Sequence, residues 1–148
     1  MEMRILVPVD GTAVGEAVLS KLENLILKDI PGVEAEIILL KVAVIDIPHD
    51  DIGKEFDFPT YWGAQLEKSK KYLADVQAKL SEEGTKVDTV VVEVGWPAQV
   101  ITNFSQQNGV DLIVITSYGN TGLKNLMFGS VALRVLHDSH IPVLLIRP

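Results

Sequence analysis

The chain has 148 residues, 47% of them hydrophobic and 22% charged, and contains no cysteine. The length suits one domain spanning residues 1–148, and the composition excludes a disordered chain. The formal net charge of −7 argues against a nucleic-acid partner, and the lack of cysteine excludes disulfides, thiolate metal sites and thiol nucleophiles. Since no signal segment and no membrane-length apolar run is found, we expect a soluble, cytoplasmic protein with no membrane partner.

Five short apolar runs rich in β-branched residues alternate with longer amphipathic segments. The runs cover residues 5–9, 35–44, 87–94, 110–115 and 143–146, and most are continuous, as in strands covered on both faces. Helical spacing of apolar residues recurs over 14–26, over 61–83, from Pro97 to Asn108-Gly109, and over 130–138. This βαβαβαβαβ order predicts an α/β fold, a five-stranded parallel sheet with right-handed crossovers and four helices.

Polar residues follow the first strand, where ligands of open parallel sheets bind. Asp10 comes after Pro8 and Val9 and is followed by Gly11 and Thr12. One interpretation makes Asp10 or Thr12 a helix cap and Gly11 a tight turn. The other places Asp10 at the mouth of the sheet, to accept a hydrogen bond from a ribose hydroxyl or to hold a metal ion. Neither a dinucleotide fingerprint nor a Walker P-loop is present, and Pro8 occupies the place of a phosphatase nucleophile.

The segment after the fourth strand is rich in glycine. Thr116 ends the strand, Gly119, Gly122 and Gly129 follow, and Ser130 opens the last helix. Backbone N–H groups exposed by glycines, together with the positive end of a helix dipole, make an anion site without a cationic side chain. The alternative is a glycine-rich turn with a serine cap.

These residues resemble the universal stress protein family, specifically its nucleotide-binding branch, which is marked by G-x2-G-x9-G-[ST] after the fourth strand. Gly119, nine further residues and Gly129-Ser130 keep the second part of that motif, whereas Thr116 stands where the motif begins with glycine. The similarity spans the whole chain, with further landmarks at residues 7–12, 39–42, 95–97, 110–114 and 141–146.

The resemblance implies a Rossmann-like sandwich of the adenine nucleotide alpha hydrolase type with strand order 3-2-1-4-5. It further implies that ATP binds, with Mg²⁺ at Asp10, and that two copies pair through the last strand. An apolar edge strand gives a separate motive for pairing, because its backbone groups are otherwise unsatisfied. The implied site has Asp10 near the ribose and phosphates, Val42 offering its backbone to adenine, and a phosphate loop. The implied cofactor-binding residues are Pro8, Val9, Asp10, Val42, Thr116, Gly119, Gly122, Gly129, Ser130 and Val131.

The preferred hypothesis is a binding module that holds ATP and signals its occupancy under stress with little or no turnover. No general base or cationic clamp for phosphoryl transfer is visible in the sequence. One alternative is a slow ATPase or self-phosphorylating protein that uses Ser117, Thr121 or Ser130 as acceptor and Asp10 with Mg²⁺. Another is a dimeric protein that acts only through contacts and no longer binds nucleotide.

Other conspicuous residues receive simpler interpretations. We expect residues 43–60 to form a long connection, either a flap whose Phe56 and Phe58 close over the base or a partner-binding loop. Trp96 is interpreted as a packing residue. The three histidines lack metal-ligand spacing. Lys68, Lys70 and Lys71 are expected on a solvated helix face.

Overall fold

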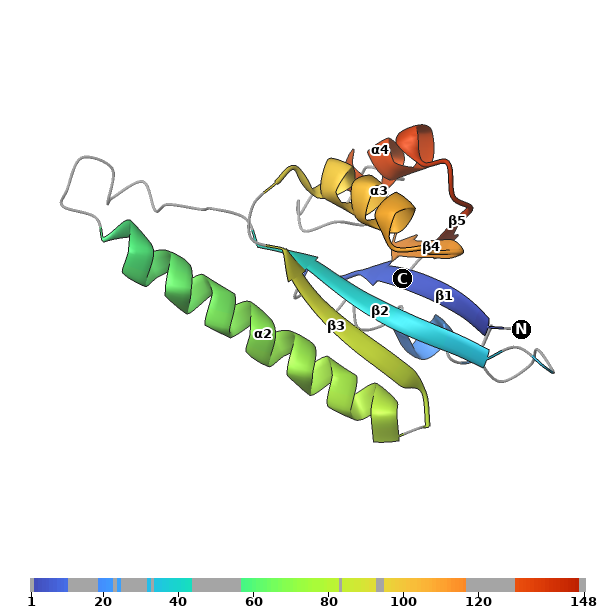
Figure 1. The fold of residues 1–148 in the computed structure, drawn as a ribbon, viewed down its shortest axis with the longest axis horizontal. Coiled ribbons are helices and arrows are strands. Elements are labelled where there is room, and N and C mark those ends of the chain that lie inside the picture. The colour runs from blue at the N-terminus through green and yellow to red at the C-terminus, as the bar shows by residue number, and fades with distance from the viewer. Residues whose placement is uncertain are drawn as a thin grey trace.

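The computed structural model describes residues 2–10, 19–22, 24, 32, 34–43, 57–82, 84–92, 95–116 and 130–146. Its strands are β1 (Glu2–Pro8), β2 (Glu34–Val42), β3 (Lys86–Val92), β4 (Leu112–Thr116) and β5 (Val143–Ile146). Its helices are α2 (Phe58–Glu82), α3 (Pro97–Gln107) and α4 (Ser130–Asp138), and residues 19–22 are also helical. The sheet is parallel with the order β3-β2-β1-β4-β5, which confirms the predicted topology (Figure 1).

Two apolar cores lie on opposite faces of the sheet. In β1 and β2, Ile5, Val7, Ile37 and Leu39 pack with Leu73 and other residues of α2. The intervening residues of the same strands face the other way and pack against α3 and α4, in a second core that includes Leu6, Ile38, Leu40, Ile101 and Val135. Because successive side chains alternate between faces, a strand buried on both sides must be apolar throughout, which explains the continuous runs.

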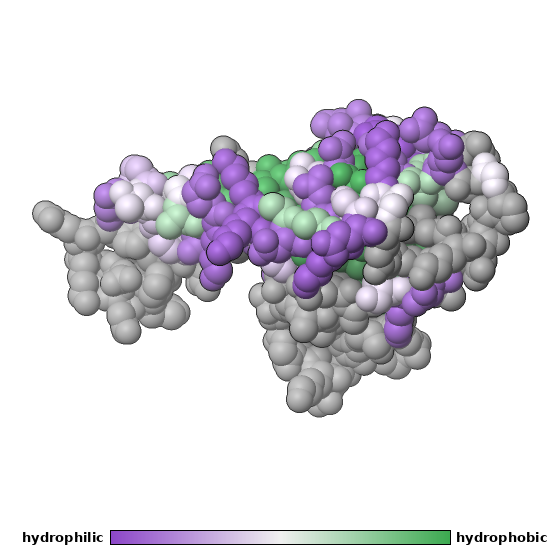
Figure 2. All heavy atoms as spheres, turned by 90° about the horizontal axis from the view of Figure 1, so that it is seen from below, coloured by the Kyte–Doolittle hydropathy of each residue, from purple (hydrophilic) through white to green (hydrophobic). Residues whose placement is uncertain are grey.

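The helices form a layer on each side of the sheet (Figure 1). Helix α2, at 25 residues, is about 37 Å long, whereas the seven-residue strand β3 spans about 23 Å. The amino-terminal part of α2 therefore extends past the carboxyl end of the sheet. Seen from below, the described surface is mainly hydrophilic, with apolar residues showing in patches between polar ones (Figure 2).

Two glycines with left-handed backbone allow the chain to enter strands directly after helices. Gly84, with φ +88°, follows α2, and Gly109, with φ +61°, follows α3. Beyond Gly109, the N–H of Val110 donates to the carbonyl of Ser105 over 3.2 Å, which satisfies a carbonyl in the last turn of α3. The predicted helix ends at these two glycines are confirmed.

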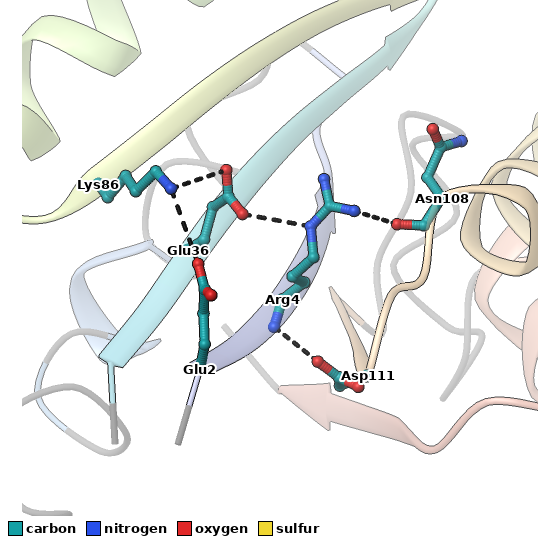
Figure 3. A network of polar contacts seen from close by, with 6 residues as sticks. All are labelled: Glu2, Arg4, Glu36, Lys86, Asn108 and Asp111. Carbon is teal, nitrogen blue, oxygen red and sulfur yellow. Dashed lines mark hydrogen bonds and ion pairs between the residues drawn. The ribbon is translucent and has the colours of Figure 1, made fainter. Parts of the chain in front are cut away.

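A polar network joins the strands at the amino end of the sheet (Figure 3). Arg4 on β1 donates from Nε to Glu36 on β2 over 3.2 Å and from its guanidinium to the carbonyl oxygen of Asn108. Lys86 on β3 lies 3.6 Å from the same Glu36 carboxylate and 3.8 Å from that of Glu2. Glu36 is the centre of the network because both cations pair with its carboxylate. Its side chain is buried, with 11% exposed. This network lies at the end of the sheet opposite the predicted ligand edge.

Candidate functional site

The strand order places a switch point between β1 and β4, the central strands from which the chain winds in opposite directions. Crossovers from neighbouring strands part at such a point and leave a crevice at their carboxyl ends. Pro8 ends β1, Val42 ends β2 and Thr116 ends β4, so all three lie at this edge. The fold thus brings these separated residues to one side of the molecule.

Val9, directly after β1, is held in place by the neighbouring strand β2. Pro8 is in register with Leu40, and the N–H of Val9 donates to the Leu40 carbonyl over 2.9 Å. Val9 is buried in the core, whereas Asp10 is exposed. Ala43, directly after Val42, donates its N–H to the Val92 carbonyl over 3.1 Å. Asp10 is therefore exposed directly after a residue whose backbone is held by β2.

Helix α4 begins at Ser130, as the sequence predicts. Ser130 is exposed, and Val131 is partly buried against the core on the α3 and α4 side of the sheet. The first turn of α4 contains no acidic residue, so no carboxylate there competes with a bound anion for the helix N–H groups. Gly119, Gly122 and Gly129 lie outside the described residues, as do Gly11, Thr12, Ser117 and Thr121.

The site residues expected from the sequence did not include Lys41, a cation near the carboxyl edge of the sheet. Lys41, the penultimate residue of β2, donates from Nζ to the Oγ of Ser69 on α2 over 2.9 Å. Burial, followed by the nearby charge of Lys68, lowers the pKa of Lys41, and the opposite charge of Asp10 partly offsets this effect. The sequence signal was a lysine directly after the apolar run 37–40 of β2, and its side chain faces α2.

The segment between β2 and α2 is shorter than predicted. The long connection does not extend to residue 60, because α2 already begins at Phe58. Asp57 accepts hydrogen bonds from the backbone N–H of Thr60 at 3.3 Å and from its hydroxyl at 2.6 Å, which caps the helix. Phe58 stacks on Trp62 with ring centroids 6.2 Å apart, so it belongs to the helix rather than to a flap. Residues 44–56, including Phe56, lie outside the described residues.

Trp96 does not pack into the core, and the prediction that it does was wrong. Its side chain is 80% exposed at the position preceding α3. Its carbonyl accepts from the N–H of Val100 over 2.9 Å, so backbone geometry rather than burial fixes it there. The rigid Pro97 that follows starts the helix.

The three lysines expected on a solvated helix face agree with that interpretation. Lys68, Lys70 and Lys71 are exposed on α2, as expected. His137 lies 2.7 Å from Asp138, which also pairs with Arg134 at 2.8 Å. Within the described ranges, no three histidine or acidic residues gather as a metal site would require. No described helix is both long and apolar enough to cross a membrane.

A parallel sheet with this switch point, covered by helices on both faces, defines a doubly wound α/β protein. The profile of the Universal stress protein family matches residues 1–147. The chain therefore belongs to the universal stress protein family.

Relatives of known name agree with this assignment. Universal stress protein MJ0531 of Methanocaldococcus jannaschii is 31% identical over 145 residues, which cover 97% of this chain and 81% of the relative. Universal stress protein YxiE of Bacillus subtilis is 40% identical over 77 residues, covering 52% of this chain and 51% of YxiE. Universal stress protein MJ0577 of Methanocaldococcus jannaschii is 35% identical over 81 residues, 55% of this chain and 49% of the relative.

Solved structures share the fold. The structure of the protein MJ0577 superposes with a TM-score of 0.77 at 30% identity, covering 99% of this chain and 96% of that one. A universal stress protein family member from Arabidopsis thaliana, solved with AMP bound, has a TM-score of 0.70 at 19% identity and covers 98% and 91%. A universal stress protein in complex with cAMP has a TM-score of 0.61 at 18% identity and covers 98% and 96%.

Proposed function

We propose that this protein is a stress-response module that binds an adenine nucleotide, with ATP as its ligand, at the carboxyl edge of the sheet. The observation that carries the proposal is the convergence of Asp10, Val42 and the start of α4 at the edge beside the β1–β4 switch point. Family membership supports it, as do two fold neighbours that were solved with AMP and with cAMP.

Each part of the edge suits one part of the nucleotide. The exposed Asp10 carboxylate accepts hydrogen bonds from ribose hydroxyls or holds Mg²⁺, and the backbone of Val42 meets adenine. Phosphates lie at the amino end of α4, where Ser130 adds a hydroxyl donor and Val131 packs the helix onto the sheet. The loop with Gly119, Gly122 and Gly129 completes the phosphate site, which Pro8, Val9 and Thr116 border.

The ligand is tested on the purified protein. Denaturation followed by mass spectrometry should release an adenine nucleotide, and added ATP should raise the melting temperature of nucleotide-free protein, since a ligand that binds only the folded state stabilises it. Gly129→Val should remove the ATP-induced shift, because a side chain there blocks the approach of phosphate to the backbone. A protein that carries no nucleotide and whose melting temperature ignores millimolar ATP would contradict the proposal.

Binding without appreciable turnover is the proposed mode of action. A single-turnover assay with labelled ATP and Mg²⁺ should show nucleotide bound but not cleaved, with no label on the protein. Release of phosphate, or phosphorylation of Ser130, would instead favour the slow ATPase or self-phosphorylating alternative.

We also propose a homodimer in which β5 pairs with its copy. β5 lies at one end of the strand order, and Leu144 on it is 36% exposed. Leu133 and Leu136 on α4, the helix that precedes β5, are 57% and 39% exposed. Pairing of two β5 strands would satisfy edge backbone groups and cover apolar side chains.

The match over residues 1–147 supports a single domain, and we propose the cytoplasm as its location, in keeping with the cysteine-free sequence.

A further inference from the structure

The indole of Trp96, at 80% exposed, is the most exposed large apolar side chain in the described part of the chain. Its backbone is nevertheless held on both sides. Its carbonyl accepts from the N–H of Val100 over 2.9 Å, and the ring of Pro97 follows. Gly95 before it lies so close to Val100 that a Cβ at Gly95 would overlap the Cγ2 of Val100. An indole on such a fixed backbone can stack on a flat partner with little further ordering of the chain.

Trp96 follows β3, the strand next to β2 in the sheet. Val92 ends β3 in register with Val42, and its carbonyl accepts a hydrogen bond from the N–H of Ala43 over 3.1 Å. Neighbouring strands lie about 4.8 Å apart, and the four residues from Val92 to Trp96 span at most about 14 Å. Val92 and Val100 pack on the same core, so the first turn of α3 lies against the end of β3. The indole is therefore within reach of a ring bound at the end of β2.

Trp96 also lies on the same side of the sheet as the proposed phosphate site. α3 and α4 pack against each other, side by side on one face (Figure 1). Ala98 at the start of α3 and Val131 at the start of α4 pack on one core. The proposed ligand crosses the strand ends from α4 after β4, past Asp10 after β1, to Val42 on β2. β3 is the next strand in that direction, so Trp96 lies beyond the base end of the ligand.

We infer that the indole of Trp96 stacks on the adenine base, an inference that rests on the proposed nucleotide site. Hydrogen bonds to the backbone of Val42 use the edge of the base and leave its two faces in contact with water. Stacking on an aromatic ring removes one face from water and adds affinity without regard to the phosphates. Val42 would then select adenine by its edge, and Trp96 would add affinity through the area of the ring.

The affinity test compares the two tryptophans of the chain. Calorimetry with ATP and with AMP is carried out on the unaltered protein and on Trp96→Ala, Trp96→Phe and Trp62→Phe. We expect Trp96→Ala to weaken both ligands by the same factor, about five- to a hundredfold, because both carry the same base. Trp96→Phe should lose less, since it keeps an aromatic ring. Trp62→Phe is the control, because Trp62 stacks on Phe58 of α2, and it should bind as the unaltered protein does.

Fluorescence tests the contact itself. Trp62→Phe leaves Trp96 as the sole indole, and ATP should quench its emission with a midpoint equal to the calorimetric Kd. Trp96→Phe leaves only Trp62, whose emission should stay constant as ATP is added. Circular dichroism melts of each variant confirm that the fold is retained. Constant emission from Trp96 while calorimetry records ATP binding would overturn the inference.

The outcomes distinguish this inference from the proposed function. If the unaltered protein binds ATP and Trp96→Ala binds it equally well, the inference is overturned and the nucleotide site stands. A loss in Trp96→Ala that Trp96→Phe shares in full overturns it too, because stacking needs only an aromatic ring. If the unaltered protein binds no adenine nucleotide at all, the proposed function is overturned, and the inference falls with it.

Discussion

Arg4 and Asp111 exchange two hydrogen bonds that join β1 to the start of β4. The backbone N–H of Arg4 donates to Oδ2 of Asp111 over 2.8 Å, and the N–H of Asp111 donates to the Arg4 carbonyl over 2.9 Å. Figure 3 shows the first of these bonds beside the Arg4 ion pair. This junction fixes the two strands between which the switch point opens at their other ends.

Asp111→Ala should therefore lower the free energy of unfolding by roughly 1 kcal/mol, because the N–H of Arg4 loses a charged acceptor. Urea unfolding followed by circular dichroism measures the change. Asp75→Ala, at an exposed position in the middle of α2, is the control and should change stability by less than about 0.5 kcal/mol. If Asp111→Ala were as stable as Asp75→Ala, the hydrogen bonds between Arg4 and Asp111 would contribute nothing measurable to the free energy of unfolding.

Two glycines should respond to alanine in opposite directions. A Cβ at Gly95 would overlap the Cγ2 of Val100, and the residue has φ +157°, whereas a Cβ at Gly63 in α2 meets nothing within 4 Å. Gly63→Ala should stabilise the protein by about 0.5–1 kcal/mol, since alanine is the better helix former. Gly95→Ala should destabilise it, and thermal melts of the two variants compare them. A stabilising Gly95→Ala would contradict the described approach of Val100.

The cap of α2 should depend on pH. Hydrogen bonds from the side chain and then the backbone of Thr60 lower the pKa of Asp57 below its ordinary value. Its contribution to stability is therefore present above the pKa of the unfolded chain and is lost as pH falls through the lower, folded value. An NMR titration of the Asp57 carboxyl should give a midpoint below that of an unstructured aspartate. Thr60→Val should move the midpoint upward, and a midpoint unaffected by that change would refute the cap.

The proposed dimer predicts a change in mass. Leu145→Pro removes a backbone donor from the free side of β5, because the register of β5 with β4 turns the N–H of Leu144 towards β4, and should convert a dimer to a monomer in light scattering at micromolar concentration. Leu133→Asn, on the exposed face of α4, tests whether that helix belongs to the interface and should weaken the dimer if it does. A monomeric mass for the unaltered protein would refute the dimer outright.

The sheet was predictable because its strands are buried on two faces and so carry continuous apolar runs. The start of α2 was missed, although Asp57 followed by Pro59 in the first turn is a recognisable helix beginning. Trp96 was misjudged because residue type predicts burial only on average, whereas its place before α3 directs it to solvent. The coupling of Lys41 to Asp10 depends on the register of neighbouring strands, which one sequence does not show.

The central claim is that an adenine nucleotide binds beside Asp10 and the start of α4. Calorimetric titration of ATP into the unaltered protein, Asp10→Ala and Ser130→Ala tests it most directly, with Asp75→Ala as the charge-matched control. The account predicts measurable binding, a loss of roughly ten- to a hundredfold for Asp10→Ala, and a loss of about 0.5–1.5 kcal/mol for Ser130→Ala. Identical ATP affinities in the unaltered protein and both site variants would contradict it.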